Sequence, residues 1–197
     1  PAGAMSFGNG GVPHREGRTL MLLPQLPEDA QGPSAKSSGE VFYNPAMAGS
    51  RTRSVLLFRH AMEEGMLGDG TVYALDGLTA SGLRARRWLN ELPCELSSRI
   101  SATIVDLEKE ALDWARSSHK EFPPSDGVGN LQTFQGDLRA AVLSSGRHWI
   151  DIDPYGSPAP FIDSAMQSMA RSGVMEVSAT DTAALTGSSK TALMRRY

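Results

Sequence analysis

The chain has 197 residues, of which 40% are hydrophobic and 21% are charged, and its formal net charge is −3. This length suits one domain with a sizeable core or a domain with a tail, and the slight acidity excludes a uniformly basic surface that coats nucleic acid. No apolar run approaches the roughly 20 residues that cross a bilayer, no signal peptide opens the chain, and the single cysteine, Cys94, excludes an internal disulfide, so we expect an intracellular protein without a membrane partner.

The first 40 residues differ in composition from the rest of the chain. Residues 1–13 are rich in glycine and other small residues, which is typical of a flexible lead. Residues 18–23 are apolar enough to form a short strand, whereas residues 24–40 are polar and contain prolines, which indicates a loop or a disordered insert. We therefore interpret residues 1–40 as a flexible lead and residues 41–197 as the domain.

From residue 41 onward, helical and strand patterns alternate regularly. We predict strands at 71–75, 100–105, 131–134, 149–152 and 174–179, and helices at 52–66, 81–92, 108–120, 138–144 and 159–171. Strands separated by helices predict a mainly parallel sheet with right-handed crossovers. The expected fold class is therefore α/β, with a doubly wound sheet.

The turn after the first predicted strand, residues 76–84, is rich in small residues. Small residues let the backbone approach a ligand closely, and the N-terminus of the following helix offers unpaired N–H groups. The turn lacks a complete G-x-G-x-x-G pattern, so a dinucleotide pyrophosphate is not indicated. The acid at its start, Asp76, repels phosphate and suits a cationic or amino group, and we take Asp76 and Gly82 as candidate cofactor-binding residues.

An acid follows each of four predicted strands, and open α/β sheets bind their ligands at the carboxyl ends of their strands. These acids are Asp76, Asp106, Asp137 and Asp153. One such aspartate is equally well explained as a helix cap, but four of them at four strand ends describe a ligand site. Asp106 suits ribose hydroxyls and Asp137 an adenine amino group, so together they indicate a cofactor that carries adenosine without phosphate, namely S-adenosylmethionine.

The octapeptide 151–158, with the sequence DIDPYGSP, closes the fourth predicted strand. Pro154 lacks an N–H and ends the strand pairing, and Gly156 allows a tight turn. A carboxylate, a prolyl carbonyl and the ring of Tyr155 are thereby gathered at one strand end. Acceptors beside a stacking ring suit an exocyclic amine on a flat heterocycle, although an ordinary Asp-Pro-x-Gly turn is the alternative.

Four separated stretches, at 41–51, 76–84, 151–158 and 178–185, resemble the tRNA (guanine(26)-N2)-dimethyltransferase family. The resemblance runs in consistent order from about residue 16 to residue 197. It implies a class I methyltransferase with a Rossmann-like fold that moves one or two methyl groups from S-adenosylmethionine to the N2 amine of a guanine in tRNA, at position 26.

The resemblance also implies roles for particular residues. Arg51 and Arg84 would bind the methionine carboxylate, a role that suits a guanidinium. Asp106 would bind the ribose, and Asp137 with the backbone of Leu138 would bind the adenine. These five complete the cofactor-binding candidates.

The acceptor side of the site follows from the same resemblance. Asp153, Pro154 and Tyr155 match the catalytic positions around the target amine, and Tyr155 also contacts the base. Phe42 matches an aromatic residue near the cofactor and the base, and so is a candidate for substrate binding.

Some residues depart from the family pattern, and other functions stay open. Thr52 and Arg53 replace an acidic-apolar pair, and Thr186 stands where the family often has cysteine. Family members continue into a C-terminal domain that helps hold tRNA, which we expect this chain to lack. The alternatives are a cofactor-binding module that contacts tRNA or protein but is inactive without that domain, or a methyltransferase for a DNA base or a protein amide. The histidines show no metal-ligand spacing, so we predict no metal site.

Overall fold

The computed structural model describes residues 10–24, 41–125, 127, 129–143 and 146–197. Most of the predicted flexible lead and the polar stretch at 25–40 lie outside the described residues. No helix in the described ranges is both long and apolar enough to cross a membrane.

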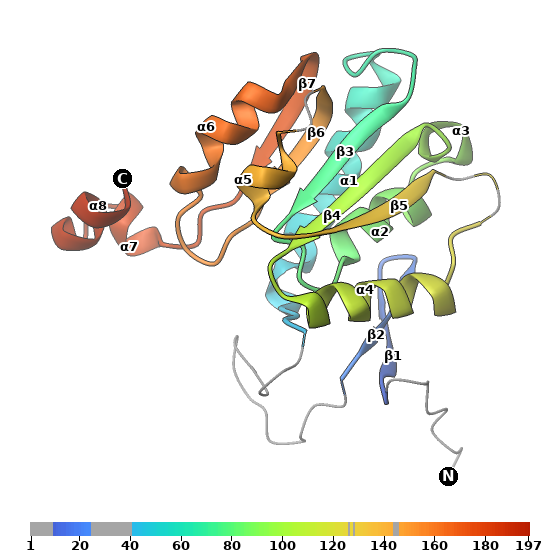
Figure 1. Cartoon of the computed structure of the whole chain (residues 1–197), viewed down its shortest axis with the longest axis horizontal. Coiled ribbons are helices and arrows are strands. Elements are labelled where there is room, and N and C mark those ends of the chain that lie inside the picture. Colours follow the sequence, from blue (N-terminus) through green and yellow to red (C-terminus); the bar gives the residue numbers. More distant parts are fainter. Residues whose placement is uncertain (1–9, 25–40, 126, 128, 144–145) are drawn as a thin grey trace.

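A sheet of five parallel strands forms the centre of the molecule, in the order β5-β4-β3-β6-β7 (Figure 1). The strands are β3 (Val72–Gly77), β4 (Ile100–Asp106), β5 (Asn130–Gln135), β6 (Arg147–Ile152) and β7 (Met169–Val177). The chain runs outward from β3 to β5 and then returns to the other side of β3, so the strand order reverses between β3 and β6. The predicted doubly wound, mainly parallel sheet is confirmed, and its reversal point is where such sheets open a ligand crevice.

Helices cover both faces of this sheet because the strand side chains alternate between two apolar layers. On β3, Ala74 faces the layer that contains α1 (Ala48–Glu63), α2 (Leu83–Glu91) and α4 (Lys109–Glu121). Its neighbour Leu75 faces the layer of α5 (Leu138–Ala141) and α6 (Ala159–Ser168). The remaining short helices are η1 (Pro45–Met47), α3 (Cys94–Ser97), α7 (Thr182–Leu185) and α8 (Lys190–Arg196), of which α7 and α8 lie beside the β7 edge, at the left of Figure 1.

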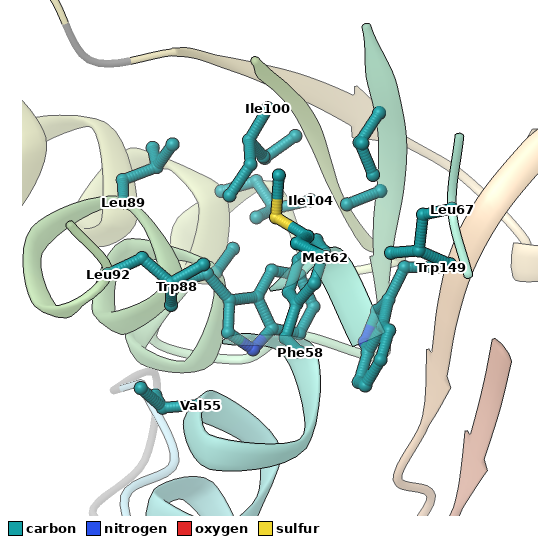
Figure 2. Packing of buried hydrophobic residues seen from close by; sticks show 14 of the residues in the cluster. Val55, Phe58, Met62, Leu67, Trp88, Leu89, Leu92, Ile100, Ile104 and Trp149 are labelled. Atoms are coloured by element: carbon teal, nitrogen blue, oxygen red, sulfur yellow. The ribbon is translucent and has the colours of Figure 1, made fainter. Parts of the chain in front are cut away.

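The larger core cluster is organised around three aromatic side chains (Figure 2). Phe58 of α1 stacks on Trp149 of β6 with ring centroids 4.4 Å apart, and Trp88 of α2 meets both rings edge-on. The indole N–H of Trp88 donates to the hydroxyl of Ser54 at 3.0 Å, which satisfies the polar group of a buried ring. These contacts hold α1 and α2 in place against β6.

An antiparallel hairpin precedes the sheet, formed by β1 (Val12–Glu16) and β2 (Thr19–Leu23). The predicted short strand at 18–23 is confirmed, but Val12 and Pro13 belong to β1 and not to a flexible lead, because they pair with Leu23 and Leu22. The hairpin is tied to the domain where the backbone N–H of Leu22 donates to the Ser118 hydroxyl of α4 at 2.9 Å.

Several predicted helix boundaries differ from the structure by two to four residues, and the causes of two of these errors are clear. Helix α1 begins at Ala48, four residues early, because Asn44 caps the turn of η1 that leads directly into it. Helix α6 ends at Ser168, and β7 begins at the next residue, where Met169 pairs with Arg147 of β6. Residues 169–173 thus extend the sheet, so tertiary pairing overrides the helical pattern read from the sequence.

The aromatic cluster generates a stability prediction. Phe58→Ala should lower the free energy of unfolding by about 3–5 kcal/mol, since it leaves a cavity against Trp88 and Trp149. Leu56→Ala, on the same helix but 60% exposed, is the matched control and should change it by less than about 0.5 kcal/mol. Urea denaturation followed by tryptophan fluorescence measures both, and equal effects of the two variants would contradict the prediction.

Candidate functional site

The turn between β3 and α2 is built around the carboxylate of Asp76. Its Oδ2 accepts the Thr79 hydroxyl at 2.7 Å and the Ala85 backbone N–H at 3.0 Å, and the side chain is buried. Two non-glycine residues of this turn, Leu78 and Ala80, have φ values of 61° and 48°. Such left-handed conformations cost energy and cluster at ligand sites, where the surrounding structure enforces them.

The glycine that ends this turn is required by packing. Gly82 has a φ of 67°, and a Cβ added there would lie 2.8 Å from the Cβ of Ala115 on α4. Gly82 therefore lets α2 and α4 approach each other closely. Asp76 and Gly82 thus have structural roles beneath the surface of the turn. Their predicted contact with a cofactor stays a prediction.

The acids after β4 and β5 also lie at the carboxyl edge of the sheet. Asp106 accepts the N–H of Ala80 at 2.8 Å and that of Glu108 at 3.0 Å, so it ties the end of β4 to the strained turn. Asp137 caps α5 by accepting the N–H of Arg139 at 2.8 Å. The side-chain and backbone hydrogen bonds from Arg139 lower the pKa of Asp137 to about 2.

Leu138, which follows the cap, is a core residue. Its side chain is buried, and its methyl groups lie so close to Gly77 that an added Cβ there would come within 2.8 Å of them. Only the backbone of Leu138 is therefore available for the predicted contact with adenine, as the prediction requires.

The densest group of charges surrounds Arg84, in the first turn of α2. Its guanidinium lies 3.1 Å from Asp151 and 2.5 Å from Asp153, both from β6 and the residues just after it, and 3.7 Å from Glu176 of β7. Asp76 contributes a further negative charge to the same surroundings. We call Arg84 and these four acids the Arg84 cluster.

One positive charge faces four carboxylates in this cluster, and burial makes the imbalance costly. Burial raises the pKa of Asp76 to about 6 and that of Asp151 well above its usual value, while the nearby Arg84 opposes both shifts. Within the part of the chain that the structure describes, neither oxygen of Asp151 accepts a hydrogen bond, and Nη1 of Arg84 donates none. The cluster is thus negative, rigidly placed and incompletely paired.

We predicted Arg84 as a ligand for the methionine carboxylate, and the structure places two of its three nitrogens against aspartates. Nη2 donates to Asp153 and Nε faces Asp151, so Arg84 holds the predicted catalytic carboxylate in position. The third nitrogen, Nη1, lies 3.7 Å from Glu176 and makes no hydrogen bond to a described residue. The predicted contact with a cofactor carboxylate stays a prediction.

Arg51 lies in a second polar cluster, which sequence reasoning did not foresee. Its guanidinium forms a two-pronged pair with Glu16 of β1 at 2.7 and 2.6 Å, and lies over the Tyr43 ring. Arg87 also donates to Glu16, at 2.9 Å. Burial and the neighbouring Glu16 raise the pKa of Tyr43 to about 12. Glu16 thereby joins the hairpin to α1 and α2. The predicted substrate-binding residue Phe42, which precedes Tyr43, is half-buried.

The segment after β6 ends in an exposed aromatic ring. Pro154 is buried, whereas Tyr155 is 94% exposed. Gly156 donates its N–H to the Thr180 hydroxyl at 2.8 Å, and its carbonyl accepts the Thr180 N–H at 3.1 Å. These two bonds bring the stretches 151–158 and 178–185 together beside a cavity of about 380 Å³, lined by Tyr155, Gly156, Ser157, Thr180, Asp181 and Arg196.

The structure therefore brings part of the predicted site together. Asp76, Arg84 and Asp153 share one cluster, and Asp106 adjoins it through the strained turn. Glu176 was missed as a site residue because it lies within the predicted strand 174–179, whereas the other acids follow their predicted strands; in the structure β7 ends at Val177. Glu16 carried no such signal, because nothing in the hairpin sequence indicates contact with α1. No group of three or more metal-ligating side chains occurs in the described ranges.

Comparisons with known proteins agree with this architecture. Residues 24–197 match the family model described as N2,N2-dimethylguanosine tRNA methyltransferase. The chain is 37% identical to tRNA (guanine(26)-N(2))-dimethyltransferase of Methanoculleus marisnigri, covering 92% of this chain and 43% of that protein. It is 31% identical to tRNA (guanine(26)-N(2)/guanine(27)-N(2))-dimethyltransferase of Aquifex aeolicus, covering 93% and 44%. The chain thus spans about half the length of the curated relatives it matches.

Among solved structures, the chain resembles Trm1 from Pyrococcus horikoshii in complex with S-adenosyl-L-methionine. The TM-score is 0.71 at 26% sequence identity, over 94% of this chain and 47% of that one. A SAM-dependent methyltransferase from Agrobacterium tumefaciens has a TM-score of 0.58 at 12% identity, over 85% of this chain and 52% of that one, and supports the fold alone.

The Arg84 cluster generates a second prediction. Arg84→Met should lower the free energy of unfolding by about 3–5 kcal/mol at pH 7, because it leaves buried carboxylates without their only cation. Arg139→Met, which breaks the exposed pair with Asp137, is the control and should cost less than about 1 kcal/mol. Urea denaturation measures both variants. A loss for Arg84→Met as small as that of the control would refute the structural role of the cluster.

The raised pKa of Asp76 generates a third prediction. Its folded-state pKa of about 6 exceeds the ordinary value of 3.8 for an aspartate, so the folded state holds the proton more tightly. The resulting stabilisation is complete below about pH 4 and is lost as the pH rises through 6. Asp76→Asn cannot ionise and should remove about 2–3 kcal/mol of that pH dependence, because each pKa unit corresponds to about 1.4 kcal/mol.

Urea denaturation at several pH values between 4 and 7 tests this change. Asp163→Asn, at an exposed position on α6, is the matched control and should follow the wild-type curve. If Asp76→Asn also followed the wild-type curve, Asp76 would not be the group that titrates.

Proposed function

We propose, since the chain belongs to the N2,N2-dimethylguanosine tRNA methyltransferase family, that it transfers methyl groups from S-adenosylmethionine to the exocyclic N2 amine of a guanine in tRNA. The names of the relatives support guanine 26 as the acceptor and two methyl additions. The observation that carries the proposal is the carboxylate of Asp153, held by Arg84 at the end of β6 just before the exposed ring of Tyr155.

The residues at the carboxyl edge fit S-adenosylmethionine. The excess negative charge of the Arg84 cluster complements a ligand that carries a sulfonium and an ammonium group, and it would repel a pyrophosphate. The unpartnered Nη1 of Arg84 supplies a donor for the methionine carboxylate. We assign Asp106 to the ribose hydroxyls, and Asp137 with the Leu138 backbone to the adenine, as open α/β sheets use strand ends in general.

Arg51 has a different standing among the predicted cofactor residues. Its two-pronged pair with Glu16 already uses its Nε and one terminal nitrogen, which also donates to the Asn44 carbonyl. We therefore assign Arg51 a supporting role, in which it positions the segment that carries Phe42 and Tyr43. Through that segment Phe42 would reach the cofactor and the base.

The acceptor guanine must leave its stack in the tRNA to reach this site. Tyr155 offers a ring with no covering side chains for one face of the base, and we assign Phe42 to the other face. Asp153 and the carbonyl of Pro154 would accept the N–H groups of the N2 amine, which leaves the lone pair of N2 free to receive the methyl group. Because Arg84 fixes Asp153 in one rotamer, little further ordering is needed.

S-adenosylmethionine, when bound, supplies a methyl group attached to a positively charged sulfur that leaves as a neutral thioether. The protein therefore contributes positioning and charge complementarity rather than activation of a leaving group. N2 loses one proton as its bond to carbon forms, and Asp153 accepts this proton. The second methyl addition repeats these steps on the remaining N–H.

Labelled methyl transfer to unmodified tRNA, measured beside cofactor binding by calorimetry, tests the proposed function. Transfer that maps to N2 of a guanine supports it. Cofactor binding without any transfer would instead favour a module that binds but does not catalyse. Transfer to DNA or protein in place of RNA would redirect the acceptor class.

The role of Asp153 gives a fourth prediction. Asp153→Asn should reduce the rate of methyl transfer by about 100-fold or more, since it removes the proton acceptor while keeping the shape of the side chain. Binding of S-adenosylmethionine should weaken much less than transfer slows, because three acids of the Arg84 cluster remain, and Asp163→Asn should leave both quantities unchanged. Full transfer activity in Asp153→Asn would show that this carboxylate has no part in the reaction.

A further inference from the structure

Asp181 is a buried carboxylate that the proposed mechanism does not use. Its side chain is only 1% exposed, and it lines the cavity beside Tyr155. Oδ1 accepts the hydroxyl of Tyr197 at 2.8 Å. Oδ2 accepts no hydrogen bond from the described residues and forms an ion pair with Nη1 of Arg196 at 3.6 Å.

Helix capping does not explain this carboxylate. Asp181 directly precedes α7, yet its side chain makes no capping hydrogen bond. A buried carboxylate oxygen without a hydrogen bond is energetically unfavourable, so a hydrogen-bond donor from outside the described residues would stabilise Oδ2 of Asp181.

The position of Asp181 indicates what that donor belongs to. Thr180, its neighbour, exchanges two hydrogen bonds with Gly156, which adjoins Tyr155 and lies three residues after Asp153. The cavity of about 380 Å³ falls within the roughly 300–1,000 Å³ typical of small-molecule sites. A base stacked on Tyr155 would therefore present its edge to Asp181.

Arg196 makes the chemistry of this cavity more specific. It lines the same cavity as Asp181 and brings a donor next to the unpaired acceptor. Guanine presents an acceptor, O6, beside a donor, N1–H, on its Watson–Crick edge. This pair complements the donor of Arg196 and the acceptor of Asp181. Adenine presents a donor at C6 and an acceptor at N1, and so opposes both groups.

We propose that Asp181 and Arg196 select the acceptor base, with Asp181 accepting the N1–H of guanine and Arg196 donating to its O6. This inference rests on the proposed function, which it deepens by naming the residues that distinguish guanine from other bases. Asp153 then remains the partner of the N2 amine, on the adjacent part of the same edge.

The Arg196 side chain is free to move into this role. It is 51% exposed, and its 3.6 Å separation from Asp181 is too long for a hydrogen bond, so it can move off Oδ2 when a base enters. Its backbone carbonyl accepts the Ser157 hydroxyl at 3.2 Å, which keeps the end of α8 beside the cavity.

An RNA with 2-aminopurine in place of the acceptor guanine tests the proposal. This base keeps the N2 amine but lacks both N1–H and O6, and its N1 is an acceptor. The wild-type protein should methylate guanine at least about 100-fold faster than 2-aminopurine, because a site built for a donor rejects an analogue that lacks it. In Asp181→Asn the amide can donate to N1 of 2-aminopurine, so the ratio should fall below about tenfold.

Two control variants separate base selection from a structural role. Tyr197→Phe removes only the hydroxyl that bonds Oδ1 of Asp181, so it should keep the preference for guanine. If Asp181 served merely to anchor Tyr197, this variant would reproduce the effect of Asp181→Asn. Asp163→Asn, at its exposed position, should match the wild-type ratio.

Each failure has a distinct reading. An unchanged ratio in Asp181→Asn overturns the inference and leaves the proposed function intact. Inactivity of Asp181→Asn on both RNAs also overturns it, because the amide should serve 2-aminopurine. If the wild-type protein binds S-adenosylmethionine but methylates neither RNA, the proposed function fails, and the inference fails with it.

Discussion

The pairing of Arg84 with a ring of carboxylates is the interaction on which the rest of the site depends. It joins four segments at the point where the strand order reverses: the end of β3 through Asp76, the start of α2, the end of β6 through Asp151 and Asp153, and β7 through Glu176. A single buried cation cannot neutralise four acids, so the cluster remains negative. This excess negative charge destabilises the protein without a ligand and favours the binding of a cationic ligand.

The same constraint explains why acids at the strand ends serve both structure and chemistry. Asp106 accepts the N–H of Ala80 in the turn that follows β3, and Asp76 accepts the N–H of Ala85 in the helix after it. These bonds hold the turn in which Leu78 and Ala80 have positive φ values. A turn held in this way cannot relax when a ligand arrives, which limits the ordering that binding requires. Arg84 restrains Asp153 by the same means. Preorganisation, rather than reactive side chains, is what this edge of the sheet contributes.

The sequence predicted the sheet well because strand and helix patterns are local. Each of the five predicted strands exists, and their acids lie at the carboxyl edge. The errors fell where tertiary pairing decides. Met169 continues a helical pattern but joins β7 because Arg147 of β6 offers a pairing partner, and Val12 joins the hairpin because Leu23 does. Boundaries such as these depend on the neighbouring strand in the sheet. A short stretch of sequence does not show which strand that is.

The sequence by itself determined the fold class and the turn at 151–158, and it placed the candidate site at the carboxyl edge, since periodicity and proline or glycine positions act over a few residues. Only the tertiary structure decided the partners of the charges. Arg84 and Asp153 are 69 residues apart, and Arg51 and Glu16 are 35 apart. Their pairing follows from strand order and side-chain direction. Likewise, Asp181 lines the cavity beside Tyr155 because Gly156 donates to the Thr180 hydroxyl and accepts from the Thr180 N–H, a contact that spacing along the chain does not encode.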